Sequence, residues 1–303
     1  DKLDPLIQIS RGCPFKCTFC ESGDDHYNRI YSFSFERAKE EISYLAKNNN
    51  CPVLQMTDLN FGMYKDDIEL CKEIAEVQKK YQWPKRFFGI NGKNSKERVI
   101  HAASLVEGAT VSAAIQSTDK TVLKSIKRSN ISLDQMIEMS KGKESKESYE
   151  SGSFSELILC LPGGTKEAHF KSIGELIDAG MGMVRSHQFI MLPGAEASNP
   201  ETRKQFNLQT QFRVIPLTVS QYELFGEVFS APEIDEICVS SSTMSYDDYL
   251  ECRLMDLTTE IFYNNGVFKE FFNFLKINGV LISELIFAIH SKVREKNNPL
   301  ESL

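Results

Sequence analysis

The sequence lacks several features that would assign it to a membrane or a nucleic acid. No apolar run approaches the roughly 20 residues that a membrane-spanning helix requires. The most apolar late stretch, VLISELIFAI, is short and contains Glu284, which indicates a buried helix. No signal peptide is visible in the opening DKLDPLIQIS, and a formal net charge of −7 gives no general attraction to nucleic acid or anionic lipid. We therefore expect a cytoplasmic protein with neither a membrane nor a nucleic acid as its partner.

A disulfide framework is also missing, although the chain has eight cysteines. Five of them are scattered, and a chain of 303 residues buries enough apolar surface to fold without covalent crosslinks. The other three, Cys13, Cys17 and Cys20, stand within eight residues in the stretch SRGCPFKCTFCESGD. This distribution predicts a reducing compartment, one specialised group of thiols and five ordinary thiols of the kind that is often buried.

The rest of the pattern alternates short apolar runs with longer amphipathic stretches. The apolar runs predict strands at 5–10, 52–58, 86–91, 109–117, 154–162 and 183–193. Helical stretches follow them at 34–49, 66–81, 96–108, 119–128, 133–141 and 166–180. Ser34 and Thr165 are placed to cap two of these helices. Six β–α units in succession predict an α/β fold, namely a partial (β/α)6 TIM-like barrel of parallel strands.

The alternation ends after Pro193. A turn-rich loop follows, then one further strand is expected at 212–220, and the remaining pattern is mainly helical. We therefore divide the chain into a core domain over residues 1–195 and a mostly helical C-terminal extension over residues 196–303 that packs on it.

The three clustered cysteines need a partner that takes three thiolates and not four. Structural zinc normally takes four ligands from two separated pairs, and the nearest further candidate, His26, has no partner of its own. Iron–sulfur cubanes are held by closely spaced cysteines, and three protein ligands leave one iron open to bind a substrate or cofactor. The loop follows the first predicted strand, at the edge where parallel α/β folds place their active sites, and Gly12 permits a tight turn there. An open iron–sulfur cluster is favoured, and structural zinc is the alternative.

The C-x3-C-x2-C spacing after a first strand, with Phe19 before the last cysteine, resembles the radical S-adenosylmethionine (radical SAM) superfamily. The resemblance implies that Cys13, Cys17 and Cys20 hold a [4Fe-4S] cluster whose open iron binds S-adenosylmethionine, with Phe19 near the adenine. One electron from the cluster would cleave this cofactor into methionine and a 5′-deoxyadenosyl radical, which removes hydrogen from an unactivated carbon. It also implies a reductant such as a flavodoxin or ferredoxin, whereas no motif indicates the substrate.

Two further segments carry the resemblance. TDLNFGM is similar to a D-x-N-F segment of the superfamily's cobalamin-associated branch, so Asp58 and Asn60 are expected near the methionine amine or the substrate. The alternative is a turn stabilised by these side chains. SAAIQSTDKTVLKSIKR is similar to the family's fourth strand and following helix, with Gln116 where a glutamate is usual. An amide there can hydrogen-bond a ribose hydroxyl but has no charge.

Other positions in these segments have two readings each. Ser117 either binds the ribose or caps the next helix, and Arg128 either pairs with the methionine carboxylate or is solvated. LPGGTKEA is similar to the family's L-P-G-x-T-x-E turn, so the backbone at Gly163 and Gly164 is expected to approach the cofactor closely. His187 either lines the cavity or, as the pattern favours, is a satisfied core histidine.

The resemblance is closest to the branch that carries an upstream cobalamin-binding domain. The printed chain begins one strand before the cysteines, so it is either a fragment or a protein without cobalamin. The leading expectation is a radical enzyme that functionalises an unactivated carbon by methyl transfer, with cobalamin supplied by a missing upstream domain. The alternatives are a radical dehydrogenase, cyclase or rearrangement enzyme, and a non-catalytic iron–sulfur binding or electron-transfer module.

Overall fold

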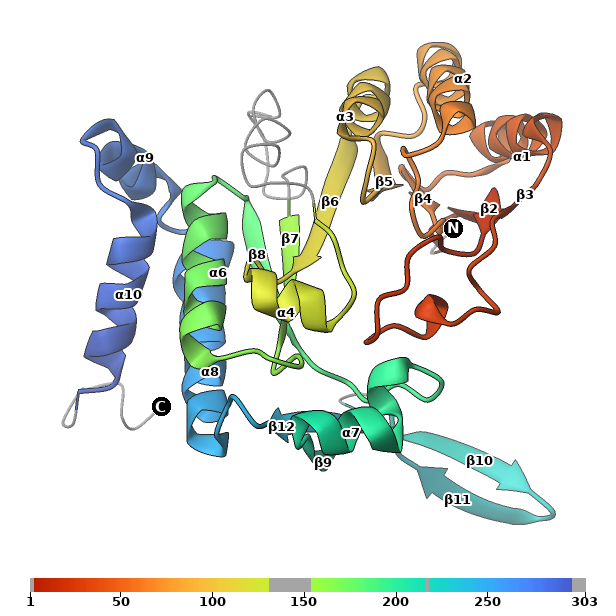
Figure 1. Cartoon of the computed structure of the whole chain (residues 1–303). Coiled ribbons are helices and arrows are strands. Elements are labelled where there is room, and N and C mark those ends of the chain that lie inside the picture. Colours follow the sequence, from red (N-terminus) through yellow and green to blue (C-terminus); the bar gives the residue numbers. More distant parts are fainter. Residues whose placement is uncertain (1–2, 131–153, 216–217, 296–303) are drawn as a thin grey trace.

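A parallel sheet of six strands organises the computed structural model, which describes residues 3–130, 154–215 and 218–295. The strands are β1 (Leu6–Ile7), β4 (Val53–Met56), β5 (Arg86–Ile90), β6 (Ala109–Gln116), β7 (Phe154–Leu159) and β8 (Met183–Gln188). They lie side by side in that order, and each pair is parallel (Figure 1). All six carboxyl ends therefore meet at one edge, and the prediction of a partial (β/α)6 barrel is confirmed.

Helices connect these strands, as the amphipathic stretches predict. They are α1 (Phe35–Asn48), α2 (Lys65–Tyr81), α3 (Lys96–Leu105), α4 (Lys120–Ser125) and α6 (Lys166–Asp178). Both predicted caps are present: the Ser34 hydroxyl accepts from Arg37 N and the Thr165 hydroxyl accepts from Ala168 N. The helix expected at 133–141 lies outside the described residues.

One buried core is built from apolar side chains of helices α1, α2 and α3 and of strands β1, β4, β5 and β6. Ile42 of α1 and Ile74 of α2 pack with Leu54, Phe87 and Ile90 of the strands, and all five side chains are fully buried. Burying each of them contributes about 1.5–3 kcal/mol to the free energy of unfolding. This packing holds the strands in place, so the loops at their carboxyl ends rest on a rigid base.

The C-terminal region contains the expected helices, α8 (Tyr246–Thr259), α9 (Lys269–Ile277) and α10 (Ile282–Val293). It also contains four strands where one was predicted. β9 (Gln209–Val214) pairs with β12 (Ile234–Ser240), and between them β10 (Ser220–Leu224) and β11 (Glu227–Ala231) form a hairpin that projects from the body (Figure 1). The strand expected at 212–220 thus corresponds to the end of β9 and the first residue of β10.

Apolar packing joins this region to the barrel. One buried cluster contains Leu159 and Phe189 from the barrel together with Cys238 and Cys252 from the extension. The division at residue 195 remains a prediction, since two of the three apolar clusters contain residues from both sides of it. None of the described helices is both long enough and apolar enough to cross a membrane.

Candidate cofactor site at the cysteine loop

The cysteine loop joins two short strands, β2 (Ser10–Arg11) and β3 (Tyr31–Ser32), which pair antiparallel and close its base. Gly12 has φ +102°, and a Cβ at this position would lie 1.8 Å from the Arg29 carbonyl oxygen, so only glycine fits. The next residue is held by a hydrogen bond from Cys13 N to Tyr27 O at 2.9 Å. The turn predicted at Gly12 is therefore confirmed, and it directs the first cysteine inward.

Nitrogen donors approach two of the three loop sulfurs. Cys13 Sγ lies 3.4 Å from Asn60 Nδ2 and 4.0 Å from Lys93 Nζ, and Cys17 Sγ lies 3.6 Å from an Arg128 guanidinium nitrogen. Cys13 and Cys17 are buried, whereas Cys20 is partly exposed. Hydrogen bonds to the sulfurs are typical of iron–sulfur sites, so these donors fit a site of that kind.

The side chains of the loop cysteines are not gathered into one ligand set. Among the described residues, no group of three histidine, cysteine, aspartate or glutamate side chains has the arrangement of a metal site. This holds equally for the zinc alternative that involved His26, whose side chain is exposed. The assignment of Cys13, Cys17 and Cys20 as cluster ligands therefore rests on the loop, its spacing and the donors around it.

Arg128 follows α4 and its guanidinium reaches back to the loop. Its Nε donates to Asn130 Oδ1 at 2.8 Å, one terminal nitrogen donates to the Ala114 carbonyl, and the group lies 6.0 Å from the centre of the Phe19 ring. A solvated arginine, one of its two readings, is therefore wrong. The structure brings Arg128, Phe19 and Cys17 together, whereas the contacts of Arg128 and Phe19 with a cofactor remain predictions.

Asp58 and Asn60 follow β4, and both are buried. Asp58 accepts hydrogen bonds from Ile9 N at 2.9 Å and from the Ser10 hydroxyl, so its carboxylate holds the chain that leads into the cysteine loop. Burial raises the pKa of Asp58, and these hydrogen bonds oppose the rise. Neither side chain therefore stabilises its own turn, as the alternative expected: Asp58 bonds a distant segment and Asn60 contacts Cys13, and their contact with the cofactor or substrate remains a prediction.

Gln116 ends β6 in a left-handed conformation, with φ +66°. Its side-chain oxygen is buried and has no hydrogen-bond partner among the described residues. The Ser117 hydroxyl accepts from Asp119 N at 3.1 Å, and the Asp119 carboxylate caps α4. The reading of Ser117 as the helix cap is therefore wrong, and its contact with a ribose remains a prediction.

The backbone of the turn after β7 itself requires glycine at positions 163 and 164. Gly163 has φ +80°, and a Cβ there would lie 3.1 Å from Ser125 Oγ on α4. A Cβ on Gly164 would lie 2.9 Å from the Leu161 carbonyl oxygen. Both positions therefore need glycine for the turn itself, and the close approach of a cofactor to them remains a prediction.

Several buried oxygens in the cysteine loop and near the ends of β4, β5 and β6 have no hydrogen-bond partner among the described residues. They include Thr18 Oγ1, Asn60 Oδ1, Asn91 Oδ1 and Gln116 Oε1. Buried polar atoms are nearly always satisfied in proteins, so such a set fits a polar ligand that would bind them. Together with the donors at Cys13 and Cys17, these residues fit a cluster with an attached polar cofactor.

Sequence reasoning missed Lys93 and Glu156 and misjudged His187. Lys93 follows β5, outside any motif, yet it approaches Cys13 Sγ and the Phe15 ring. Its position after a strand's carboxyl end was the only available indication. The core reading of His187 is wrong, because its side chain is 47% exposed and its Nε2 lies 3.1 Å from Glu156 Oε1.

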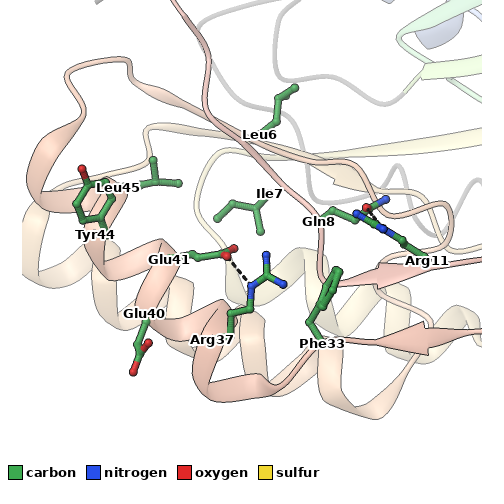
Figure 2. Close-up of a pocket in the computed structure, with 10 residues that line it drawn as sticks. All are labelled: Leu6, Ile7, Gln8, Arg11, Phe33, Arg37, Glu40, Glu41, Tyr44 and Leu45. Carbon is green, nitrogen blue, oxygen red and sulfur yellow. Dashed lines mark hydrogen bonds and ion pairs between the residues drawn. The ribbon is translucent and has the colours of Figure 1, made fainter.

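A separate groove of about 520 Å³ lies at the β1 edge of the sheet, against α1. Figure 2 shows that its lining includes Leu6, Phe33 and Tyr44, with Arg37 bonded to Glu41. None of the predicted site residues lines this groove. The candidate site is therefore the cysteine loop at the carboxyl edge of the sheet.

The fold and the loop define a partial parallel barrel with a three-cysteine cofactor loop at its carboxyl edge. Residues 7–142 match the family model of the Radical SAM superfamily, and the chain belongs to that superfamily. It is 32% identical over 212 residues to the cobalamin-dependent radical SAM methyltransferase TokK of Streptomyces tokunonensis, an alignment covering 68% of this chain and 30% of TokK. It is 30% identical over 254 residues to the 2-(S-pantetheinyl)-carbapenam-3-carboxylate methyltransferase of Streptantibioticus cattleyicolor, covering 82% and 36% of the two chains.

Solved structures support the fold. The radical S-adenosylmethionine methyltransferase TsrM of Kitasatospora setae, in a structure with cobalamin and a [4Fe-4S] cluster bound, has a TM-score of 0.54 at 13% identity. The match covers 72% of this chain and 39% of TsrM. The chain thus spans about a third of the length of the curated relatives it matches.

Proposed function

We propose that this chain is the radical SAM part of an enzyme that reductively cleaves S-adenosylmethionine and methylates an unactivated carbon with the help of cobalamin. The observation that carries the proposal is the set of donors at the loop sulfurs, Asn60 and Lys93 at Cys13 and Arg128 at Cys17. The relatives that match over most of this chain are named as methyltransferases, which favours methyl transfer over dehydrogenation, ring closure or rearrangement.

In this proposal Cys13, Cys17 and Cys20 would hold a [4Fe-4S] cluster, and the chemistry it would supply is one-electron reduction of S-adenosylmethionine. Arg128 is already fixed by Asn130 and the Ala114 carbonyl, so it offers a preorganised cation to a carboxylate at the loop. Asn60 presents its amide nitrogen to Cys13 and keeps its buried oxygen for a donor such as the methionine amine. Phe19 provides an apolar face for the adenine beside that cation.

The test uses the protein with all its domains, reconstituted anaerobically with iron, sulfide and cobalamin and supplied with a flavodoxin or ferredoxin as reductant. The first substrate to try is 2-(S-pantetheinyl)-carbapenam-3-carboxylate, because a relative is named for it. We expect 5′-deoxyadenosine, S-adenosylhomocysteine and a methylated product. Cleavage without S-adenosylhomocysteine would favour the dehydrogenase, cyclase or rearrangement reading. A cluster that forms but never cleaves S-adenosylmethionine, with any substrate tried, would favour an electron-transfer module.

A further inference from the structure

A histidine–carboxylate pair lies on the inner face of the sheet. β7 and β8 run parallel, with Glu156 opposite Arg185 and Ile158 opposite His187. The alternate residues of β7, such as Leu157, are buried against the helices, so Glu156 and His187 point to the other face. Glu156 Oε1 and His187 Nε2 are 3.1 Å apart.

This pair differs from a structural pair of the same chemistry elsewhere in the chain. His169 Nε2 lies 2.8 Å from Asp256 Oδ1, and these side chains are 6% and 7% exposed. The side chains of His187 and Glu156 are 47% and 30% exposed. The first pair joins α6 to α8 inside the protein, whereas the second presents its ring to open space.

The open pair lies beside the strand that holds Arg128. Ala114 is the register partner of Glu156 on β6, and its carbonyl accepts from Arg128, which reaches Cys17 Sγ. Neighbouring strands are about 4.8 Å apart, so Glu156 lies about one strand spacing from Ala114, whose carbonyl holds Arg128. The hydrogen bond from His187 holds the pKa of Glu156 below its ordinary value, with smaller contributions from the charges of Arg185 and Arg128.

The contact with Glu156 determines which ring nitrogen of His187 donates a hydrogen bond and which accepts one. An ionised carboxylate only accepts hydrogen bonds, so Nε2 of His187 carries the proton toward Glu156. In the neutral ring Nδ1 is then the acceptor, and a carboxylate partner of this kind holds both the tautomer and the ring orientation. We propose that His187, oriented by Glu156, positions the substrate by accepting a hydrogen bond from an O–H or N–H group that the substrate carries. This inference rests on the proposed function, because it assumes that the inner face binds the substrate.

Nuclear magnetic resonance of the chain with 15N-labelled histidine tests the inference without turnover. Three probes of similar size are added in turn at a pH where the ring is neutral: phenol, which carries an O–H donor, anisole, which carries none, and benzoate, which is an anion. We expect Nε2 of His187 to be protonated, and phenol alone to shift the Nδ1 resonance. In the wild type and in the Glu156 variants, the resonances of His169 report that the fold is intact.

Two variants complete the experiment. Glu156→Ala is expected to lose the phenol-dependent shift, and Glu156→Gln, which keeps an acceptor oxygen, is expected to retain part of it. The matched control Asp256→Asn changes the His169 resonances and leaves those of His187 as they were. Each of four results in the wild type would overturn the inference. The first is a proton on Nδ1. The others are equal shifts with phenol and anisole, no shift with phenol, and a shift with benzoate alone. A full phenol shift in Glu156→Ala would overturn it as well. Because no S-adenosylmethionine is cleaved in this measurement, its failure is distinct from a failure of the proposed function.

Discussion

Two groups of cysteines are buried in this protein, and they differ in what surrounds their sulfur atoms. Cys13 and Cys17 have an amide, an ammonium and a guanidinium group within 4.0 Å. Cys71 and Cys252 lie in apolar clusters, where burial raises the pKa of both thiols, that of Cys71 to about 12. Burial alone therefore does not define the role of a thiol, and its polar neighbours distinguish a ligand from a packing group.

The difference follows from where each group lies in the fold. Cys71 is on α2 and Cys252 on α8, each on the side of the helix that faces the core. The loop cysteines are in irregular chain at the carboxyl edge, where side chains after β4, β5 and β6 converge on them. Around Cys71 and Cys252 the helices place mainly apolar side chains, whereas the strand ends bring donors from several elements to the loop cysteines.

The sharpest way to test this contrast is to remove one thiol from each group. In Cys17→Ala we expect the cluster to be lost and S-adenosylmethionine cleavage to fall at least about 100-fold, since a cluster ligand acts as part of a unit. In Cys252→Ala we expect both to persist, while the cavity lowers the free energy of unfolding by about 1–2 kcal/mol. Iron content, the visible absorption spectrum and 5′-deoxyadenosine formation measure the first effects, and chemical denaturation measures the last. Equal cleavage by the two variants would remove the distinction between the groups.

The second test removes a donor in place of a thiol. Arg128→Ala takes away the guanidinium at Cys17 and Phe19, and we expect cleavage to fall about 10-fold, because a fixed charged hydrogen-bond donor is lost. Lys127→Ala is the matched control, since the neighbouring cation forms an exposed ion pair with Glu196 and such pairs contribute little. A similar loss in both variants would mean that local charge, and no specific contact, explains the effect.

Much of the fold could be predicted because its elements follow local rules. Hydrophobic periodicity and the caps Ser34 and Thr165 predicted the strands and helices of the barrel to within a few residues. The hairpin β10–β11 could not be found this way, since all but one of its residues are exposed and no alternation between buried and exposed positions marks it.

The site could be predicted only where a motif carried it. The spacing pointed to Cys13, Cys17 and Cys20 as cluster ligands, which remains a prediction. The resemblance added Asn60 and Arg128, which the structure places at two of the sulfurs. Lys93 and Glu156 have no motif, and their roles depend on which strands lie side by side. Register between β6, β7 and β8 is a tertiary property, so a single sequence does not contain it in readable form.

The two histidine–carboxylate pairs repeat the contrast between a buried packing group and an open one. We expect His169→Ala to lower the free energy of unfolding by about 2 kcal/mol, because the buried Asp256 loses its hydrogen bond from α6 and keeps only Arg253 as a charged partner. His187→Ala should cost less than about 1 kcal/mol, as its pair with Glu156 is largely exposed to water. Urea denaturation of both variants measures the difference. If the two losses were equal, the open pair would have to be regarded as structural as well.

The smallest expected effect is the change in the free energy of unfolding that ionisation of the buried Cys71 thiol causes at high pH. The pKa of Cys71 is about 12 in the folded chain and near 9 when the chain is unfolded, because burial disfavours the thiolate. A raised pKa contributes stability that is fully present below pH 9 and is lost as the pH rises toward 12. Between pH 8 and pH 10 the wild type should therefore lose about 1 kcal/mol more than Cys71→Val, in which this thiol cannot ionise. Urea denaturation at the two pH values measures this, and an equal loss in both proteins would show that Cys71 ionises in the fold as readily as an exposed thiol.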